Sequence, residues 1–294
     1  MTQVGDILRR VGALPPLPDT ALKLMQVIND PQSTVEDIVE AIRYDQAVTG
    51  ELLRLCNSAH FGLSRKVTSL NDAMLFLGTA KVLQLVMSVH TSGLLSKEQI
   101  GYGLEPGMLW KHSVGVALAC SHLSVRLKLS DTGLVFTAGL LHDVGKVVLN
   151  EYVADEFAEI VHLVTEDDLS FLEAEHQVLG FSHEEIGGKI AESWQLPETI
   201  IQCIRHHHGP STLDPIDPLV DTVYVADSIC LMCGIGLGQD GLSYRADPTV
   251  TKRLDLVERD LEVIGSEVLT DLENVEQMFA DGSKAGLQEQ PVSR

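Results

Sequence analysis

Residues 139–146 of the chain are Gly-Leu-Leu-His-Asp-Val-Gly-Lys, an apolar run that ends in a histidine next to an aspartate. A neutral imidazole and a carboxylate at adjacent positions can offer two ligands to a metal ion. Other histidines and an acid farther along the chain could complete a site for two metal ions. His142 and Asp143 therefore raise the question of whether this protein is an enzyme or only has the scaffold of one.

The composition indicates a globular protein with a substantial core. The chain has 294 residues, of which 45% are hydrophobic and 21% are charged, and this length suits one large domain or two modest ones. The formal net charge of −21 argues against a broad electrostatic surface for nucleic acid or anionic lipid, although it leaves room for a local basic pocket. We expect neither a DNA partner nor a membrane partner.

The sequence predicts a soluble, cytoplasmic protein. Its first residues lack the basic, apolar and small-residue order of a signal peptide. The most apolar stretches, 73–89 and 219–238, are short or interrupted by Lys81, Asp221 and Asp227, which is unsuitable for a membrane span. Five cysteines, an odd number at scattered positions, are typical of reduced thiols.

Helical patterns cover nearly the whole chain and alternating strand patterns are scarce, so we expect an all-α fold. Capping-box spacing predicts helix starts at Ser33 and Ser182. Pro197 and Pro218 suit the first position of two further helices, with Asp217 as the cap of the second. Other expected helices cover residues 45–56, 69–89, 108–128, 133–150, 152–165 and 255–281.

The Gly-rich segment 91–107, which also contains Pro106, is the best candidate for a boundary between domains. We therefore expect an N-terminal helical subdomain over residues 1–100. A second helical subdomain, which holds the candidate metal ligands, is expected over residues 101–282. Residues 283–294 are expected to form a flexible tail.

Several short segments of the N-terminal third carry a family resemblance. They are Leu14-Pro15-Pro16-Leu17-Pro18, Asp30-Pro31, Asp45-Gln46, Leu52-Leu53-Arg54-Leu55-Cys56-Asn57-Ser58-Ala59 and Ala73-Met74-Leu75-Phe76-Leu77-Gly78. From about residue 12 to residue 235, the chain resembles an HDOD domain, a bacterial module related to the HD superfamily of metal-dependent phosphohydrolases. The resemblance implies a multi-helix HD-type bundle with an N-terminal HDOD subdomain. It also implies a regulatory or signalling module with a protein partner more than it implies an enzyme.

The resemblance further implies a set of metal ligands. Catalytic HD proteins, including the HD-GYP phosphodiesterases, use a leading His, a His-Asp pair, a later His, a His-His pair and a distal acid. The matching residues in this chain are His112, His142, Asp143, His183, His207, His208 and Asp227.

Three histidines follow one another at 206–208, and they cannot all face one centre because each step turns a helix by about 100°. The family's His-His-x-Pro ending favours His207 and His208, which leaves His206 to solvent or packing. The alternative that His206 replaces one of them stays open.

Such a ligand set suits two divalent cations, for which iron or manganese is favoured and zinc is an alternative. Two metal ions about 3.5–4 Å apart can activate water and polarise a phosphoryl oxygen. A carboxylate bridges two cations well, and this role would belong to Asp143. Lys146 lies one helical turn beyond His142 if the helix continues past Gly145, and it could contact a substrate phosphate. Asp143 and Lys146 are therefore the candidate catalytic residues.

Each of these residues also has a purely structural interpretation. His112 could be a packed histidine of an apolar helix, and the run of three histidines could be a polar helix end. Asp227 could cap a helix or form an ion pair. Seven matches in order and type favour metal binding over these alternatives. The spacing of Cys230 and Cys233 is that of a redox or zinc motif, but no second pair accompanies them, so we expect two small hydrophobic side chains.

Two functions remain open from the sequence. The first is a regulatory module in which a buried metal stabilises the fold. The second is a metal-dependent phosphohydrolase of a phosphomonoester or phosphodiester, such as a phosphorylated small molecule or nucleotide. HD-GYP phosphodiesterases carry a Gly-Tyr-Pro loop that helps hold a cyclic dinucleotide, and residues 209–215, Gly-Pro-Ser-Thr-Leu-Asp-Pro, lack it. Hydrolysis of cyclic di-GMP is therefore not expected. A solvent-reachable open coordination position near Lys146 would favour the enzyme, and a closed one the structural role.

Overall fold

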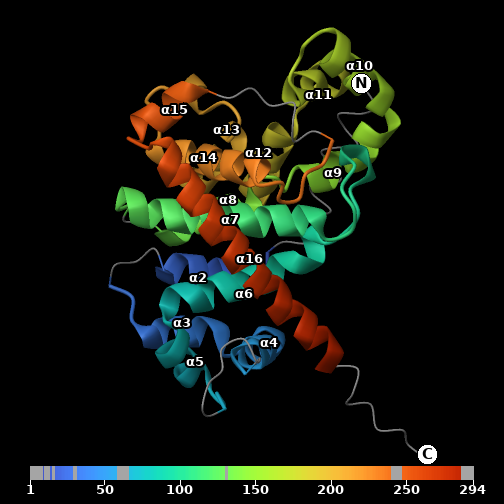
Figure 1. Ribbon diagram of the computed structural model, residues 1–294. Helices are drawn as coiled ribbons and strands as arrows, with labels where there is room; N and C mark the ends of the chain where they lie inside the picture. The colour runs from blue at the N-terminus through green and yellow to red at the C-terminus, as the bar shows by residue number, and fades with distance from the viewer. Residues whose placement is uncertain are drawn as a thin grey trace, which may run out of the picture. The chain divides into compact units, whose positions relative to one another are not determined.

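The computed structural model describes residues 17–28, 32–57, 66–129, 132–239 and 247–285, together with residues 9 and 14. Within these ranges the regular secondary structure is helical, and the only β-type pairing recorded there is an isolated bridge between Gln99 and Leu104 (Figure 1). The predicted all-α fold class is confirmed.

The chain forms two compact units. The described residues within 18–90 and 269–294 make up one, which we call the small unit, and those within 1–17 and 91–268 make up the other, which we call the site unit. Both units are discontinuous in sequence, and the division falls within helices α6 (Thr79–Leu95) and α16 (Glu258–Ala285).

The small unit buries an almost purely apolar core. Leu24, Ile42, Leu52 and Met87 are each at most 1% exposed. Asp45 caps a helix because its carboxylate accepts from the Val48 N–H at 3.0 Å. The helices of this unit are α2 (Asp19–Ile28), α3 (Val35–Ile42), α4 (Gln46–Cys56), α5 (Leu70–Leu77), α6 as far as His90, and α16 from Leu269 onward.

Two expectations for the small unit need correction. The capping box of α3 is formed by Thr34 and Asp37, one residue later than the Ser33 start that the spacing predicted. The expected helix over 69–89 is two helices, because Gly78 has φ 77°, a conformation that ends α5 and that glycine adopts without strain. The family segments at Pro15-Pro16, Asp30-Pro31 and Ser58-Ala59 lie outside the described residues.

The site unit is organised around α7 (Met108–Leu127), which is buried on most of its surface. Helix α8 (Thr132–Leu141) approaches it closely at Gly139, where a Cβ atom would lie 2.8 Å from the Cys120 Sγ. The other elements are η2 (Ile100–Tyr102), α8 (Thr132–Leu141), α9 (Lys146–Asp155), α10 (Phe157–Glu166), α11 (Phe171–Leu179), α12 (His183–Ser193), α13 (Glu198–His206), η3 (Pro210–Thr212), α14 (Pro218–Met232), α15 (Pro248–Arg253) and α16 as far as Val268.

The prediction of one continuous helix over residues 133–150 is wrong, because the middle of this range is not helical. Helix α8 ends at Leu141, residues 142–145 form a turn, and α9 begins at Lys146. The turn lies directly against α12, because a Cβ atom on Gly145 would be 1.9 Å from the His183 carbonyl oxygen. Only glycine fits there, so this close approach explains Gly145 of the 139–146 segment.

Other predicted helix ends are confirmed or shifted. Asp217 caps α14 with Pro218 in its first turn, as predicted. Pro197 is the N-cap of α13 rather than its first residue, because its backbone is extended (ψ 141°). The helix expected over 152–165 is divided between α9 and α10, and residues 283–285 of the expected tail belong to α16. Residues 286–294 lie outside the described part of the chain.

One stretch of the described residues, Thr132–Asn150, is long and apolar enough to cross a membrane by length and composition alone. Most of it is packed inside the fold, with 78% of its apolar window buried, as in the core helix of a globular unit. The helices Leu70–Leu77 and Lys81–Leu95, bent by 117°, pass the same test only if they are counted as one span. These are weak indications of a membrane segment.

Candidate metal centre

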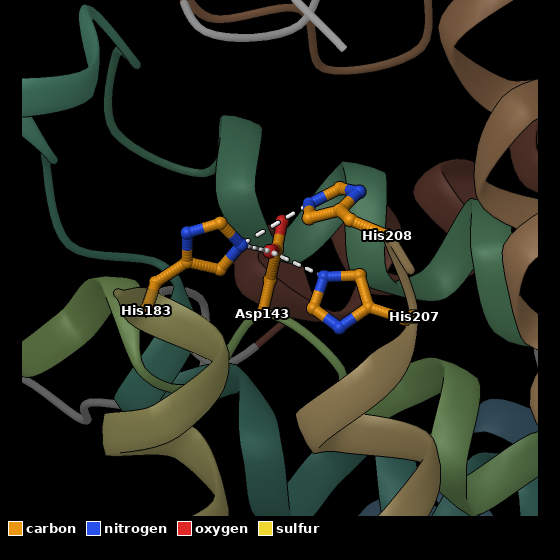
Figure 2. Close-up of side chains that lie close together, drawn as sticks. All are labelled: Asp143, His183, His207 and His208. Atoms are coloured by element: carbon orange, nitrogen blue, oxygen red, sulfur yellow. Dashed lines mark hydrogen bonds and ion pairs between the residues drawn. The ribbon is translucent and has the colours of Figure 1, made fainter. Parts of the chain in front are cut away.

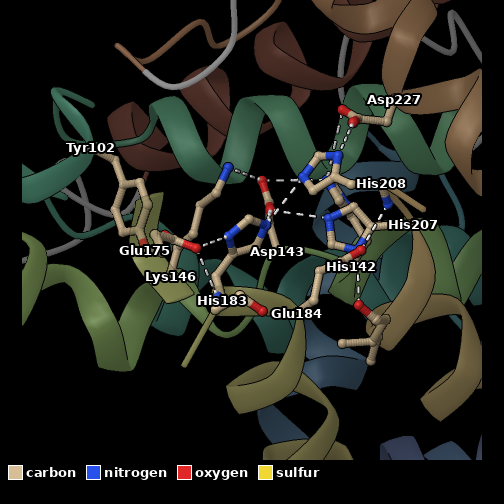
Figure 3. Close-up of polar contacts among 12 residues, drawn as sticks. Tyr102, His142, Asp143, Lys146, Glu175, His183, Glu184, His207, His208 and Asp227 are labelled. Carbon is tan, nitrogen blue, oxygen red and sulfur yellow. Dashed lines mark hydrogen bonds and ion pairs between the residues drawn. The ribbon is translucent and has the colours of Figure 1, made fainter. Parts of the chain in front are cut away.

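The structure brings all seven predicted ligands into one buried cluster of the site unit. Their side chains are each at most 7% exposed. They come from three helices and from the turns that follow two others, and Asp143 lies at the centre of the group (Figures 2 and 3). His112 lies on α7, His142 and Asp143 in the turn after α8, His183 at the start of α12, His207 and His208 after α13, and Asp227 on α14.

Contacts at helix ends fix the positions of two of these ligands, His183 and His207. Ser182 caps α12 by accepting from the Glu185 N–H at 3.3 Å, and its own N–H donates to the Glu185 carboxylate at 3.0 Å. This capping box, which the sequence predicted, makes His183 the first residue of the helix. His207 follows the last residue of α13, so its ring bonds back to the last turn of that helix.

Three of the histidines have their ring orientation fixed by the backbone. In each, Nδ1 lies within hydrogen-bond distance of a main-chain carbonyl oxygen, which can only accept, so Nδ1 carries the proton. In a neutral ring, Nε2 then presents a lone pair to the centre of the cluster, which is the ligand form of imidazole. The bonds are those of His112 to the Ile235 carbonyl (2.9 Å), His142 to Gly139 (2.7 Å) and His207 to Ile204 (2.8 Å).

The two oxygens of Asp143 face two different groups of donors. Oδ2 lies 3.3 Å from Nε2 of His142 and 3.8 Å from Nε2 of His112. Oδ1 lies 3.6 Å from Nε2 of His183 and 3.7 Å from Nε2 of His207 (Figure 2). Within each group, one donor atom per residue lies within 4.8 Å of all the others. Asp143 therefore lies between two sets of imidazole nitrogens, each of which could hold a metal ion together with this carboxylate.

We call the two groups the first half and the second half of the cluster. The first half consists of the group Asp143 Oδ2, His112 and His142, to which we add Asp227. The Oδ1 of Asp227 lies 3.0 Å from Nε2 of His112 and 3.9 Å from Nε2 of His142. The second half consists of Asp143 Oδ1, His183, His207 and His208. In the second half, Nε2 of His208 lies 3.1 Å from Nε2 of His183, so two ring nitrogens face each other.

The cluster fits metal ions because its central atoms lack other partners. His142 Nε2, His207 Nε2 and Asp143 Oδ1 are buried and make no hydrogen bond. Lone pairs of imidazole and carboxylate that face one another away from water are unfavourable, whereas a cation between them satisfies both. The His/Asp cluster could therefore hold metal.

The electrostatics of the cluster also favour the ligand forms. Burial lowers the pKa of His207 to about 4, and it holds the pKa of His208 well below the usual range, so both rings are neutral near pH 7. Burial acts against ionisation of Asp143, but the neighbouring Lys146 and His142 hold the pKa of this carboxyl well below its usual range. His207 and His208 are thus neutral beside an ionised central carboxylate, whereas burial is outweighed by Asp227 at His112 and by Glu175 at His183, so the pKa of each of these two rings is raised.

Lys146 does not follow His142 on one continuous helix, as the sequence prediction required, because the turn over 142–145 intervenes. It is the first residue of α9 and is only 5% exposed. Its Nζ donates to Asp143 Oδ2 at 2.8 Å and lies 5.4 Å from the centre of the Tyr102 ring (Figure 3). The observed role of Lys146 is therefore that of a counter-charge to Asp143.

His206 lies apart from the ligand cluster. It is the last residue of α13 and is half-buried. It lines a pocket of about 480 Å³ whose wall also includes His176, Arg205 and Glu184. Of the three successive histidines, His207 and His208 are thus the two that belong to the cluster.

Three further residues that the sequence did not single out support the ligands, two by direct contact and Tyr102 through Glu175. Glu175 Oε2 accepts from Nδ1 of His183 at 2.7 Å, and the Tyr102 hydroxyl donates to Glu175 Oε1 at 2.5 Å. Glu184 Oε1 accepts from the His208 N–H at 2.7 Å. Glu184 is adjacent to a predicted ligand and could have been found on that ground. Glu175 and Tyr102 follow no local spacing rule, since a helix break separates Glu175 from His183.

Comparison with known proteins places the chain in a family. The sequence profile of the HDOD domain matches residues 14–210, so the chain belongs to the HDOD family, as its N-terminal segments predicted. An uncharacterised protein of Treponema pallidum is 28% identical over 227 residues, which cover 76% of this chain and 43% of that protein. The chain thus spans less than half of the length of this relative.

Solved structures share the fold. An HDOD domain protein of unknown function from Geobacter sulfurreducens has a TM-score of 0.67 and 27% identity, covering 94% of this chain and 95% of that one. A proposed signal transduction protein from Marinobacter aquaeolei has a TM-score of 0.75 and 21% identity, covering 94% and 64%. A proposed phosphohydrolase from Shewanella amazonensis has a TM-score of 0.67 and 23% identity, covering 92% and 97%.

Proposed function

We propose that this chain is a regulatory HDOD module in which a buried binuclear centre of divalent metal ions stabilises the fold. The observation that carries the proposal is the division of the ligand cluster by Asp143 into two halves, each with four protein donors that are almost fully buried. Structural metal sites are characteristically closed by protein ligands, whereas catalytic sites keep a position open to substrate. The burial of this cluster favours the structural role.

The residues present suit first-row transition metals. The first half would hold one ion through His112, His142, Asp143 and Asp227, and the second half would hold another through Asp143 and three histidines. Mixed imidazole and carboxylate donors favour iron or manganese, with zinc as an alternative. When bound, the ions supply positive charge that neutralises the buried carboxylates and satisfies the ring nitrogens.

A signalling protein is the partner we propose for the module. The HDOD family assignment, and the proposed signal transduction role of the Marinobacter aquaeolei protein of the same fold, support this context. The five cysteines are all free thiols, which is compatible with a cytoplasmic location.

A second candidate function is a metal-dependent phosphohydrolase, and one contact favours it. The Lys146 ammonium lies 2.8 Å from Asp143 Oδ2, where it could hold a phosphate oxygen beside the cluster once a substrate gains access. Asp143 would then orient the reacting centre, and the substrate would be a phosphomonoester or phosphodiester of a small molecule or nucleotide. The segment 209–215 has no Gly-Tyr-Pro sequence, so cyclic di-GMP is not the proposed substrate.

Metal analysis combined with an activity panel tests the proposal. Protein prepared without chelator and supplied with iron or manganese is expected to hold about two ions per chain, and the His142→Ala/Asp143→Ala double variant none. A panel of phosphomonoesters and phosphodiesters is expected to show no turnover that the double variant abolishes. Wild-type protein without metal would refute the binuclear centre, and turnover lost in the double variant would establish the enzyme instead.

A Lys146→Met variant separates the two functions further. In a structural centre, removal of the ammonium next to Asp143 Oδ2 removes the repulsion between this ammonium and a bound metal ion, so metal affinity rises. In a phosphohydrolase, the same change removes the phosphate contact and lowers turnover. Lys252→Met, at an exposed lysine of α15, is the matched control and is expected to change neither quantity.

A further inference from the structure

His183 differs from His112, His142 and His207 in what holds its ring, and its carboxylate contact is much shorter than the 3.6 Å between His208 Nδ1 and Asp227 Oδ2. Its Nδ1 lies 2.7 Å from the Glu175 carboxylate, whereas His112, His142 and His207 use main-chain carbonyls. The same oxygen, Glu175 Oε2, also accepts from the His183 main-chain N–H at 3.0 Å. One carboxylate oxygen therefore holds both the backbone and the ring of this ligand (Figure 3).

Glu175 is itself fixed by a third element of the fold. The Tyr102 hydroxyl donates to Glu175 Oε1 at 2.5 Å, and the Tyr102 ring packs edge-on to the His183 ring with centroids 6.4 Å apart. All three side chains are fully buried. Tyr102 is anchored because the N–H of its neighbour Gly101 donates to the Asn150 Oδ1 of α9 at 2.8 Å.

The difference between a carboxylate and a carbonyl as acceptor has a chemical consequence. A carboxylate bonded to Nδ1–H pulls the ring proton toward itself and raises the electron density and basicity of Nε2. In a buried site such a charge-assisted hydrogen bond is stronger than a neutral one. Nε2 of His183 points at Asp143 Oδ1, so this effect acts on the second half of the cluster and not on the first.

Resting on the binuclear centre proposed above, we propose that Glu175, held by Tyr102, is a positioning residue for His183 that selectively strengthens metal binding in the second half. The carboxylate sets the tautomer and the direction of the ring, and it makes His183 a stronger ligand than the histidines backed by carbonyls. Glu175 does not itself contact the metal.

A Glu175→Gln variant tests this role with little risk to the fold. The side-chain amide keeps the shape of the glutamate, its oxygen can accept from His183, and its NH₂ can donate to the Tyr102 hydroxyl. Only the charge is lost. We expect the dissociation constant of the ion in the second half to rise about 10- to 100-fold, with the ion in the first half unchanged. Tyr102→Phe is expected to produce a smaller rise in the same half.

Metal titration of the full chain by calorimetry, with stoichiometry from elemental analysis, provides the readout. A His112→Ala background leaves only the second half complete, and there Glu175→Gln should weaken the single remaining ion by the same factor. Glu173→Gln, on the exposed side of the same helix, is the matched control because glutamine also serves in its capping box with Ser170. This control should bind metal like the wild type.

The possible outcomes distinguish this inference from the proposed function. Loss confined to the second half, with the unfolding midpoint of the metal-free protein unchanged, supports the positioning role. Two ions bound with wild-type affinity in Glu175→Gln, or equal weakening of both halves together with a lower metal-free midpoint, would overturn it while leaving the binuclear centre intact. A wild-type protein that binds no ion would overturn both.

Discussion

The small unit and the site unit bury different kinds of core. Among the described residues of the small unit, the core is formed by apolar side chains such as Leu24, Leu52 and Leu55, and Ser88 is the polar residue that is buried with them. The site unit instead buries ionisable side chains next to its apolar ones. They include His112, His142, Asp143, Lys146, Glu175, His183, Glu184, His207, Asp221 and Asp227.

This difference teaches what each unit needs to be stable. An apolar core is stabilised by removal of its surface from water and requires no ligand. A core of facing imidazoles and carboxylates loses the hydration of those groups and recovers it only through hydrogen bonds, ion pairs or bound cations. We therefore expect the small unit to be stable without metal and the site unit to depend on it.

Removal of metal is the change with the largest expected effect. Each ion present at a thousandfold excess over its dissociation constant adds about 4 kcal/mol to the free energy of unfolding, so a chelator should strongly destabilise the site unit. Both tryptophans of the chain, Trp110 and Trp194, belong to this unit and are buried. Their fluorescence during urea unfolding therefore reports on the site unit alone.

Circular dichroism of the same samples supplies the control, because it reports on the helices of both units. With chelator, the midpoint of the fluorescence transition should move to a lower urea concentration. The part of the circular dichroism signal that comes from the helices of the small unit should be lost at the same urea concentration as without chelator. Equal fluorescence midpoints with and without chelator would contradict the dependence of the site unit on a cation.

A cavity in the core of the small unit should destabilise that unit and leave metal binding by the site unit unchanged. Leu52→Ala removes a side chain that is 1% exposed, and such truncations cost about 2–5 kcal/mol of unfolding free energy. The loss should occur in the metal-independent part of the helical signal, with the dissociation constants of the metal ions unchanged. Leu75→Ala, at an 81% exposed position of α5, is the matched control and should leave the unfolding curve almost unchanged.

Addition of a single methyl group at Gly145, in the turn between α8 and α9, should lower stability somewhat less than Leu52→Ala does. Gly145→Ala would place a Cβ atom 1.9 Å from the His183 carbonyl oxygen, so the turn and α12 must move apart. Overpacking of this kind costs about 1–3 kcal/mol, and here it also displaces ligands of both halves. Weaker metal binding together with a lower fluorescence midpoint is expected. Gly50→Ala, where a Cβ atom meets nothing within 4 Å, is the control.

The sequence was sufficient to predict the elements that depend on local patterns. Capping residues such as Ser182 and Asp217 lie where spacing placed them, because a cap is a contact between residues two or three positions apart. The break at Gly78 was missed because both flanking segments are apolar, and apolar periodicity alone does not detect a change of helix direction.

The candidate site shows the same limit. Its ligands could be named from short motifs, and the choice of His207 and His208 over His206 agrees with their place in the cluster. Glu175 could not be predicted, because its contact with His183 depends on the direction that the chain takes at Gly180. This residue has φ 79° and joins α11 to α12. Such partners depend on how helices pack, which no spacing rule describes.

Thiol reactivity offers the smallest and most local contrast between the two units. Burial raises the pKa of Cys56 in the small unit to about 11, and it also raises the pKa of Cys120, Cys203 and Cys230 in the site unit. These four buried thiols should react slowly with iodoacetamide at pH 8, whereas the partly exposed Cys233 should react first. Chelator should then accelerate alkylation of Cys120, Cys203 and Cys230, which share a core with the metal cluster, but not of Cys56. Mass spectrometry of the alkylated peptides measures each rate, and a parallel increase at Cys56 would mean that the small unit opens together with the site unit.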